Sequence, residues 1–437
     1  MRMETAKHIA RLIDLSPSPY HVVNHLAHLL AQQGFQRLTE GEGWSLQGGG
    51  RYYLSRQDSS LVAFVMPENL TRPAPLRLCS SHTDSPTLKL KPSLLRKKGG
   101  YWLFDVAVYG SPIHSTWFDR DLSLAGLVSG LDGEGKVHQV VFQVENSITR
   151  IPNLAIHLNR GLNDSYKINP HDEMSPIWRG VTKEDDAGFS PVSLFQHWLT
   201  GQGIQLPAGW TASHWDVMLY DCQKAAFVGE AGDLVASSRL DNQVSCFAGG
   251  LALLDHVQGQ PSGGNTLAML ACFDHEEVGS LSVTGAEGNL VESVISRLYR
   301  QPEDRWRAMA QSWMLSVDNA HGCHPNYPGL QDDNHCPLIN QGVVLKSNPN
   351  QRYATNAATG GYFKGLCRQA GVAVQDFAVR SDMACGSTVG PPLSARLGIA
   401  TADIGIPTWA MHSIREVAGV RDMGDLRRVL SLFYGSS

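Results

Sequence analysis

Five short segments of this sequence carry histidines and carboxylates, the side chains that bind divalent metal ions. They are residues 80–86, 238–242, 274–280, 316–321 and 410–413. Taken singly, each has a simpler explanation, such as a helix N-cap or a solvated helix face. Imidazole and carboxylate groups are, however, ligands for zinc and related ions. The five segments together therefore indicate one metal site.

The residue types within these segments suit a pair of metal ions. Two divalent ions ~3.5–4 Å apart need a carboxylate that bridges them and further imidazole or carboxylate ligands for each. Asp241 can bridge, His82 and His412 can supply the imidazoles, and Glu277 and Asp318 can complete the two sets. The residue types predict two divalent ions per subunit and leave zinc, cobalt and manganese open.

Two more acidic residues lie beside these ligands. Glu276 directly precedes Glu277, so one of the two can bind metal while the other acts as general base toward a water whose pKa falls to ~7 on the metal. Asp84 follows His82 by two residues and can accept the second ring N–H of that histidine, which fixes its tautomer. This combination predicts a two-metal hydrolase.

The elements around these segments follow the pattern of an α/β protein. Apolar runs predict buried strands, and apolar residues at helical spacing after Asp241 predict an amphipathic helix. Helical spacing also predicts two helices before Gly34. Because ligands collect beyond the carboxyl ends of strands in such sheets, distant segments can meet there. The predicted strands are residues 76–81, 267–273, 313–317 and 399–404.

The predicted domain organisation is an α/β domain interrupted by a β-rich insertion. Two apparent strands around Gly99 and Gly100, and a further β-rich run at residues 136–145, begin a region of different character. We therefore assign residues 1–92 and 229–437 to one discontinuous catalytic domain and residues 93–228 to the insertion.

Composition excludes several classes of protein. The 437 residues are 42% hydrophobic and 18% charged, which argues against disorder, and a net charge of −5 argues against a nucleic-acid binder. Apolar runs are too short to span a membrane, and charges near the N-terminus disfavour a signal peptide, so we expect a cytoplasmic protein. The eight cysteines form no Cys-x-x-Cys, and we expect them to be reduced and mostly buried.

The motifs themselves resemble those of the aspartyl aminopeptidase family, metallopeptidase family eighteen, over essentially the whole chain. The segments that carry the resemblance are His-Thr-Asp-Ser-Pro (82–86), Ser-Arg-Leu-Asp-Asn (238–242), Asp-His-Glu-Glu-Val-Gly-Ser (274–280), Asn-Gln-Arg-Tyr (350–353) and Ala-Met-His-Ser-Ile-Arg-Glu (410–416). The resemblance implies a three-layer zinc-peptidase domain with a β-rich inserted dimerisation domain, and it favours zinc as the metal. It also implies that Glu276 is the base and that the metal ligands are His82, Asp241, Glu277, Asp318 and His412.

The resemblance further implies an aminopeptidase that removes N-terminal Asp or Glu from peptides. Alternatives are a preference for neutral residues within the same family, or a related two-zinc deacylase or carboxypeptidase. Lys346 would face the first substrate side chain, although its position alone also fits a solvated lysine at a strand end. His157 would reach a neighbouring subunit's active site, or act as a third metal-binding histidine; spacing alone does not separate either from a structural role. Dimers would assemble into a tetrahedral dodecamer, with no nucleic-acid or membrane partner.

Overall fold

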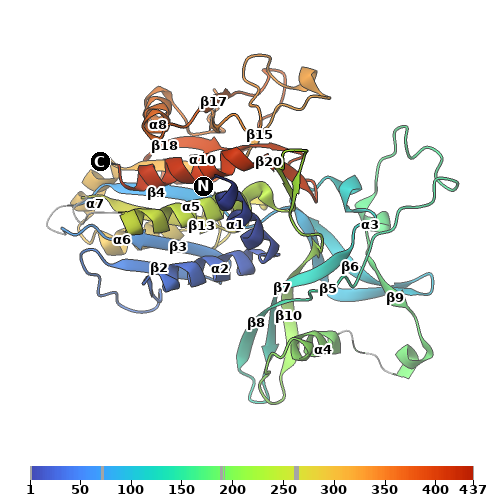
Figure 1. Ribbon diagram of the computed structural model, residues 1–437. Coiled ribbons are helices and arrows are strands. Elements are labelled where there is room, and N and C mark those ends of the chain that lie inside the picture. Colours follow the sequence, from blue (N-terminus) through green and yellow to red (C-terminus); the bar gives the residue numbers. More distant parts are fainter. Residues whose placement is uncertain (1, 70–72, 188–189, 191, 260–264, 437) are drawn as a thin grey trace. The chain divides into compact units, whose positions relative to one another are not determined.

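The computed structural model describes residues 2–69, 73–187, 190, 192–259 and 265–436 (Figure 1). The chain divides into two compact units. The first comprises Met1–Ser85, Ala225–Met411 and Glu416–Ser437, and the second comprises Pro86–Lys224 and His412–Arg415. The sequence-based division of domains at residues 93 and 228 stays a prediction. None of the helices among the described residues has both the length and the apolar character that crossing a membrane requires.

A nine-stranded sheet forms the centre of the first unit. Four neighbouring strands, β13, β4, β14 and β18, run parallel, so their carboxyl ends lie at the same edge. In sheet order, the strands are β1 (Gln36–Arg37), β2 (Arg51–Arg56), β3 (Ser60–Val65), β13 (Leu267–Phe273), β4 (Leu76–His82), β14 (Trp313–Val317), β18 (Ala400–Gly405), β16 (Val343–Lys346) and β17 (Val374–Phe377).

Helices cover both faces of this sheet. Successive strand side chains point to opposite faces, so Leu270 and Cys272 of β13 join one core while Met269 and Phe273 join the other. The first core also contains side chains of α1 (Arg2–Asp14), α2 (Pro19–Gln32), α5 (Leu240–Gly259), α8 (Ala357–Ala370) and α10 (Val420–Tyr434). The second contains α6 (Leu290–Leu298), α7 (Pro302–Met309) and α9 (Gly390–Leu397). The predicted three-layer α/β architecture is confirmed.

A five-stranded sheet in the same unit connects segments that carry predicted ligands. Its order is β11 (Ala226–Val228), β12 (Leu234–Ser237), β20 (Glu416–Gly419), β19 (Pro407–Trp409) and β15 (Ala320–His321). Strands β12 and β20 are antiparallel, with Ser237 opposite Glu416. The unit also contains two 3₁₀ helices, η3 (Glu276–Val278) and η4 (Pro328–Leu330).

The second unit is built on a six-stranded antiparallel sheet. Lys98 of β5 pairs with Tyr101 of β6, which confirms the predicted hairpin around Gly99 and Gly100. The strands, in order, are β8 (Val137–Gln143), β7 (Leu122–Leu131), β10 (Thr211–Asp221), β5 (Thr87–Lys98), β6 (Tyr101–Tyr109) and β9 (Ile177–Gly180). The helices are η1 (His114–Trp117), α3 (Pro170–Glu173), η2 (Lys183–Ala187) and α4 (Ser193–Gly201).

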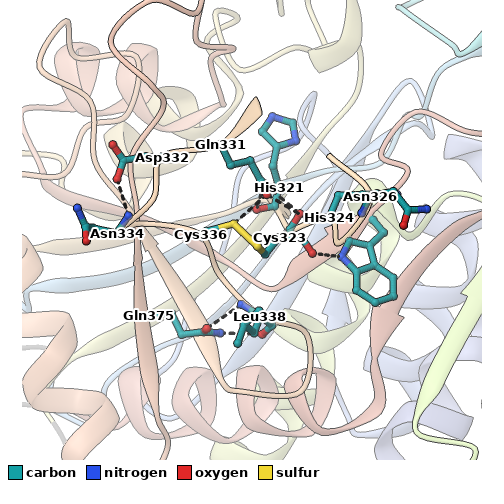
Figure 2. Close-up of a disulfide and its surroundings, with 12 residues drawn as sticks. His321, Cys323, His324, Asn326, Gln331, Asp332, Asn334, Cys336, Leu338 and Gln375 are labelled. Atoms are coloured by element: carbon teal, nitrogen blue, oxygen red, sulfur yellow. Dashed lines mark hydrogen bonds between the residues drawn. A yellow bond between two sulfur atoms is a disulfide. The ribbon is translucent and has the colours of Figure 1, made fainter. Parts of the chain in front are cut away.

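One pair of cysteines departs from the sequence-based expectation. Cys323 and Cys336 form a disulfide (Figure 2). Trp409 donates its indole N–H to the Cys323 carbonyl at 2.6 Å. The other six cysteines are free. The expectation that all eight are reduced is therefore wrong for this pair. Pairing depends on proximity in space, and a separation of 13 residues outside any motif gives no signal for it.

Candidate metal centre

The predicted ligands of the first unit converge because their strands are parallel neighbours. His82 is the last residue of β4, the Glu276–Glu277 pair follows β13, and Asp318 follows β14. The register of the parallel strands places these strand ends at the same height in the sheet. His82 of β4 pairs with Phe273 of β13, and Ser80 of β4 pairs with Ser316 of β14. Residues nearly 240 positions apart therefore meet at one edge of the sheet.

His82 lies at the centre of this group. Its Nε2 atom is 3.4 Å from Asp241 Oδ1, 3.5 Å from Asp318 Oδ1 and 3.9 Å from Glu276 Oε2. Donor atoms of His82, Asp241 and Asp318 all lie within 4.8 Å of one another, as do those of His82, Glu276 and Glu277. One imidazole nitrogen thus faces several carboxylate oxygens at distances that a small cation would span.

Asp84 links the histidine to the acidic pair. The Nδ1 atom of His82 is 3.3 Å from Asp84 Oδ1 and 3.1 Å from the Asp84 carbonyl oxygen. A proton on Nδ1 leaves the Nε2 lone pair directed at the carboxylates. The Asp84 carboxylate also accepts the backbone N–H groups of Glu276 and Glu277, each at 3.1 Å. The geometry fits the supporting role predicted for Asp84, which stays a prediction.

The donor set fits a divalent cation such as zinc. The Oδ1 atom of Asp318 is buried and accepts no hydrogen bond from the described residues, as expected of an oxygen that binds a metal ion. Imidazole nitrogen and carboxylate oxygen are ordinary zinc ligands. His82, Asp241, Glu277 and Asp318 of this unit could hold such an ion, and Glu276 lies beside them.

The pKa values of the predicted ligands and base reflect the crowding of several carboxylates in one buried place. Burial raises the pKa of Glu276 to about 8; His82 opposes this shift, and neighbouring carboxylates add to it. Burial also raises the pKa of Glu277 well above its ordinary range. At His82 burial lowers the pKa, but the carboxylates of Asp241, Asp318 and Asp84 that face its ring outweigh burial and raise the pKa. A divalent cation would relieve the repulsion among the carboxylates.

Lys346 contacts a predicted ligand directly. Its side chain is buried, with Nζ 3.3 Å from Asp318 Oδ2, 3.2 Å from the Asn319 carbonyl oxygen and 4.9 Å from the centre of the Tyr353 ring. Burial would raise the pKa of Asp318, but the charges of Lys346 and His82 outweigh it and lower that pKa. A buried lysine paired with a carboxylate differs from the solvated lysine that its position alone could suggest.

Two predicted site residues belong to the second unit. His412 is partly buried there; its Nδ1 lies 3.1 Å from the Ser111 carbonyl oxygen, and its own carbonyl accepts the Ile113 N–H at 2.9 Å. A proton on Nδ1 places the ring's lone pair on Nε2, the arrangement of many metal-binding histidines. His157 is exposed in a turn. Metal binding by His412 and the roles proposed for His157 stay predictions.

Sequence reasoning missed the residues that hold the ligands' main chain. Glu416 Oε2 accepts the Asp241 N–H at 2.8 Å, Ser85 Oγ donates to the Asp241 carbonyl at 2.6 Å, and Cys246 Sγ donates to the His82 carbonyl at 2.9 Å. Ser85 and Glu416 lie within the motifs that contain the predicted metal ligands. Their place in those motifs is the one feature of the sequence that could have identified them.

The comparison with protein families gives one match across nearly the whole chain. The model of the family described as "Aminopeptidase I zinc metalloprotease (M18)" matches residues 12–434. A "Probable M18 family aminopeptidase 2" of Pseudomonas syringae pv. tomato is 45% identical over 436 residues, covering 100% of this chain and 99% of the relative. A protein of the same description from Stutzerimonas stutzeri is 43% identical over 437 residues, with the same coverage.

Solved structures agree with this assignment. A chain from the cryo-EM structure of the Ape4 and Nbr1 complex superposes with a TM-score of 0.95 at 33% identity, covering 99% of this chain and 86% of that one. The structure of the S. cerevisiae mApe1 dodecamer gives a TM-score of 0.85 at 28% identity, covering 99% and 96%. The resemblance of the motifs is confirmed: this chain belongs to the M18 family of zinc aminopeptidases and is a metallopeptidase, a hydrolase.

Proposed function

We propose that this aminopeptidase uses two divalent ions, zinc first, to remove an N-terminal residue, preferably Asp or Glu, from peptides. The observation that carries the proposal is the convergence of His82, Asp241 and Asp318 with Glu276 beside them, 3.9 Å from the same imidazole nitrogen. Metal ligands and a separate carboxylate at one edge are what a metal-assisted hydrolysis with a protein base needs.

In this mechanism the chain supplies ligands, orientation and a base. Bound ions would polarise the scissile carbonyl and make the attacking water more acidic. Glu276 takes the proton of that water and passes it to the leaving amine. Asp84 accepts the main-chain N–H groups of Glu276 and Glu277, and so keeps base and ligand in fixed relation. The carboxylates would also attract the substrate's N-terminal ammonium, which accounts for exopeptidase action.

Lys346 supports the proposed acidic preference. An ammonium has three N–H donors, and the contacts to Asp318 and Asn319 use two of them among the described residues. A substrate carboxylate could take the third. A neutral side chain in the same place would leave the buried charge less well compensated, so it should bind more weakly.

Assembly is part of the proposal as well. The mApe1 structure is titled a dodecamer, and we propose that this chain also forms a homo-oligomer, dimers in a tetrahedral dodecamer, through its β-rich insertion. His157 would act at a neighbouring subunit's active site, and His412 would complete the ligands. A cytoplasmic location stays a prediction, which cell fractionation tests.

The test of specificity compares peptides with N-terminal Asp, Glu, Leu and Ala on the wild type and on Lys346→Met. We expect acidic peptides to lead in the wild type and to lose about 10–100-fold in kcat/KM in the variant, as for a charged hydrogen bond. Lys364→Met, which removes an exposed lysine paired with Asp376, is the control. An equal loss on all four peptides would mean that Lys346 supports Asp318 and does not recognise the substrate. Zinc analysis of the wild type tests for two ions per chain.

A further inference from the structure

We propose that Glu416 is a positioning residue for the predicted bridging ligand Asp241, an inference that rests on the proposed function. Glu416 is 2% exposed and comes from β20, a strand of the five-stranded sheet. Its Oε2 atom accepts the backbone N–H of Asp241 at 2.8 Å. A carboxylate side chain thus holds the main chain of a metal ligand 175 residues away.

The need for this contact follows from the backbone at Asp241. Helix α5 spans Leu240–Gly259, but Asp241 has φ −84° and ψ 107° and Asn242 has φ −124° and ψ 27°, neither of which is helical. The Asp241 N–H therefore lies outside the repeating hydrogen bonds of the helix and needs another acceptor when buried. Glu416 supplies it, and a negative charge at the start of a helix is also favoured by the helix dipole.

A second contact holds the other side of the same residue. Ser85 Oγ donates to the Asp241 carbonyl at 2.6 Å, and Asn242 Nδ2 donates to the Val317 carbonyl at 2.8 Å. The N–H and the C=O of Asp241 belong to the two peptide groups that flank its Cα atom. With both groups bonded, the direction of its Cα–Cβ bond is set, and with it the place of the carboxylate.

The register of the sheet fixes Glu416 in turn. Strand β20 pairs with β12 over four residues, with Glu416 opposite Ser237, the last residue of β12. The chain runs from Ser237 to Asp241 in four residues, so the pairing brings the Glu416 carboxylate to the start of α5. A bridging carboxylate must present two oxygens at once, and outer partners of ligands typically change metal affinity 10–100-fold.

The experiment measures zinc affinity of the whole chain by competition with a chromophoric chelator, and thermal unfolding of the metal-free protein. We expect Glu416→Ala to bind zinc about 10–100-fold more weakly. Glu416→Gln keeps an oxygen that can accept the Asp241 N–H, so it should stay near the wild type. Ser85→Ala should weaken zinc binding about two- to tenfold, the loss of one neutral hydrogen bond.

Asp422→Ala is the matched control. Asp422 is a buried carboxylate that accepts the backbone N–H groups of Asn340 and Gly342, neither of which is a predicted ligand. Both alanine variants should lower the unfolding temperature, but only Glu416→Ala should change zinc affinity. Equal zinc affinity in Glu416→Ala and Asp422→Ala would overturn the inference, as would a Gln variant as weak as the Ala variant. Should Glu416→Ala fail to fold, unchanged affinity in Ser85→Ala overturns it. A wild type that binds no zinc would instead overturn the proposed function.

Discussion

At the scale of single residues, His82 is the side chain that the other groups of the predicted metal centre surround. Carboxylates surround its Nε2 atom, Asp84 lies at its Nδ1 atom, and these carboxylates raise the pKa of His82 against the effect of burial. An imidazole in such a pocket attracts a proton when no other cation is present. A divalent ion takes the place of that proton, so metal affinity should rise with pH.

The roles of Glu276 and His82 can be separated by mutation. Glu276→Gln keeps the shape of the side chain and removes the base, so zinc content should stay near that of the wild type while kcat falls ~10²–10⁴-fold. His82→Ala removes a ligand and should lose zinc. Elemental analysis and steady-state kinetics measure the two effects. If Glu276→Gln lost its zinc as His82→Ala does, the separation of base and ligand would be wrong.

The sequence offers candidate ligands because each lies in a short motif at the end of a predicted strand or at the start of a predicted helix. Contacts between motifs could not. Lys346 and Asp318 are 28 residues apart, and Glu416 and Asp241 are 175 apart. Both pairs depend on which strands are neighbours and in what register, and periodicity in one segment contains no information on its partner strand.

At the scale of elements, the start of α5 shows where local pattern and tertiary contacts differ. The apolar spacing of Val244, Phe247 and Leu251 correctly predicts a helix whose apolar side chains lie in the core. The amphipathic character is wrong, because every residue from Leu240 to Leu254 is buried and this stretch has no exposed polar face. The sequence predicts that this helix begins at Asp241. The main chain there bonds instead to Glu416 and Ser85 and leaves the helical conformation. Asp241 therefore lies where hydrogen bonds to distant residues replace those of a regular helix.

The disulfide of the 323–336 segment can be tested by counting thiols. Protein purified and denatured without reductant should react with thiol reagent at six cysteines, and at all eight after reduction. Replacing Cys323 and Cys336 with serine should lower the free energy of unfolding by up to about 3 kcal/mol, the value for a closed loop of similar length. Cys222→Ser, which removes a partly buried free cysteine, is the control. Eight reactive thiols before reduction would contradict the pairing.

Helix α2 contributes a pH dependence of stability through His21. Burial, His25 and Arg239 lower the pKa of His21 from 6.5 to about 3. As the pH falls below 6.5, the unfolded chain takes up a proton that the folded chain refuses until about pH 3, so stability is lost over that range. Between pH 7 and pH 5 this amounts to about 2 kcal/mol.

His21→Gln should remove that part of the pH dependence. The measurement is urea unfolding of the metal-free protein at pH 7 and pH 5, which avoids the effect of zinc release. His28→Gln, on the exposed side of the same helix, is the control and should keep the slope of the wild type. An unchanged slope in His21→Gln would show that the histidine titrates alike in both states.

At the scale of the whole molecule, the sequence predicts the fold class more readily than it predicts which segments belong to which compact unit. Apolar strand runs and apolar residues at helical spacing predict an α/β domain, and the family resemblance implies its three layers. The segment His412–Arg415 groups with the second unit, because Ile113 donates to the His412 carbonyl and Ile414 donates to Thr116. Such contacts join positions about 300 residues apart. The local sequence around either position does not predict them.

Assembly is the last expectation to test. The side chains of Leu154, Ile156 and Leu158 in the second unit are 54%, 44% and 75% exposed, on either side of His157. Exposed apolar side chains gathered on one short segment are typical of an interaction surface. We therefore expect a mass in solution several times 47.7 kDa by light scattering. Leu158→Asp should reduce that mass with zinc content unchanged.

His157→Ala should keep the mass and the zinc but lose about 10²–10³-fold in kcat, as when one donor to the transition state is removed. A fully active monomer would contradict the proposed assembly, and normal turnover in His157→Ala would remove that histidine from the active site.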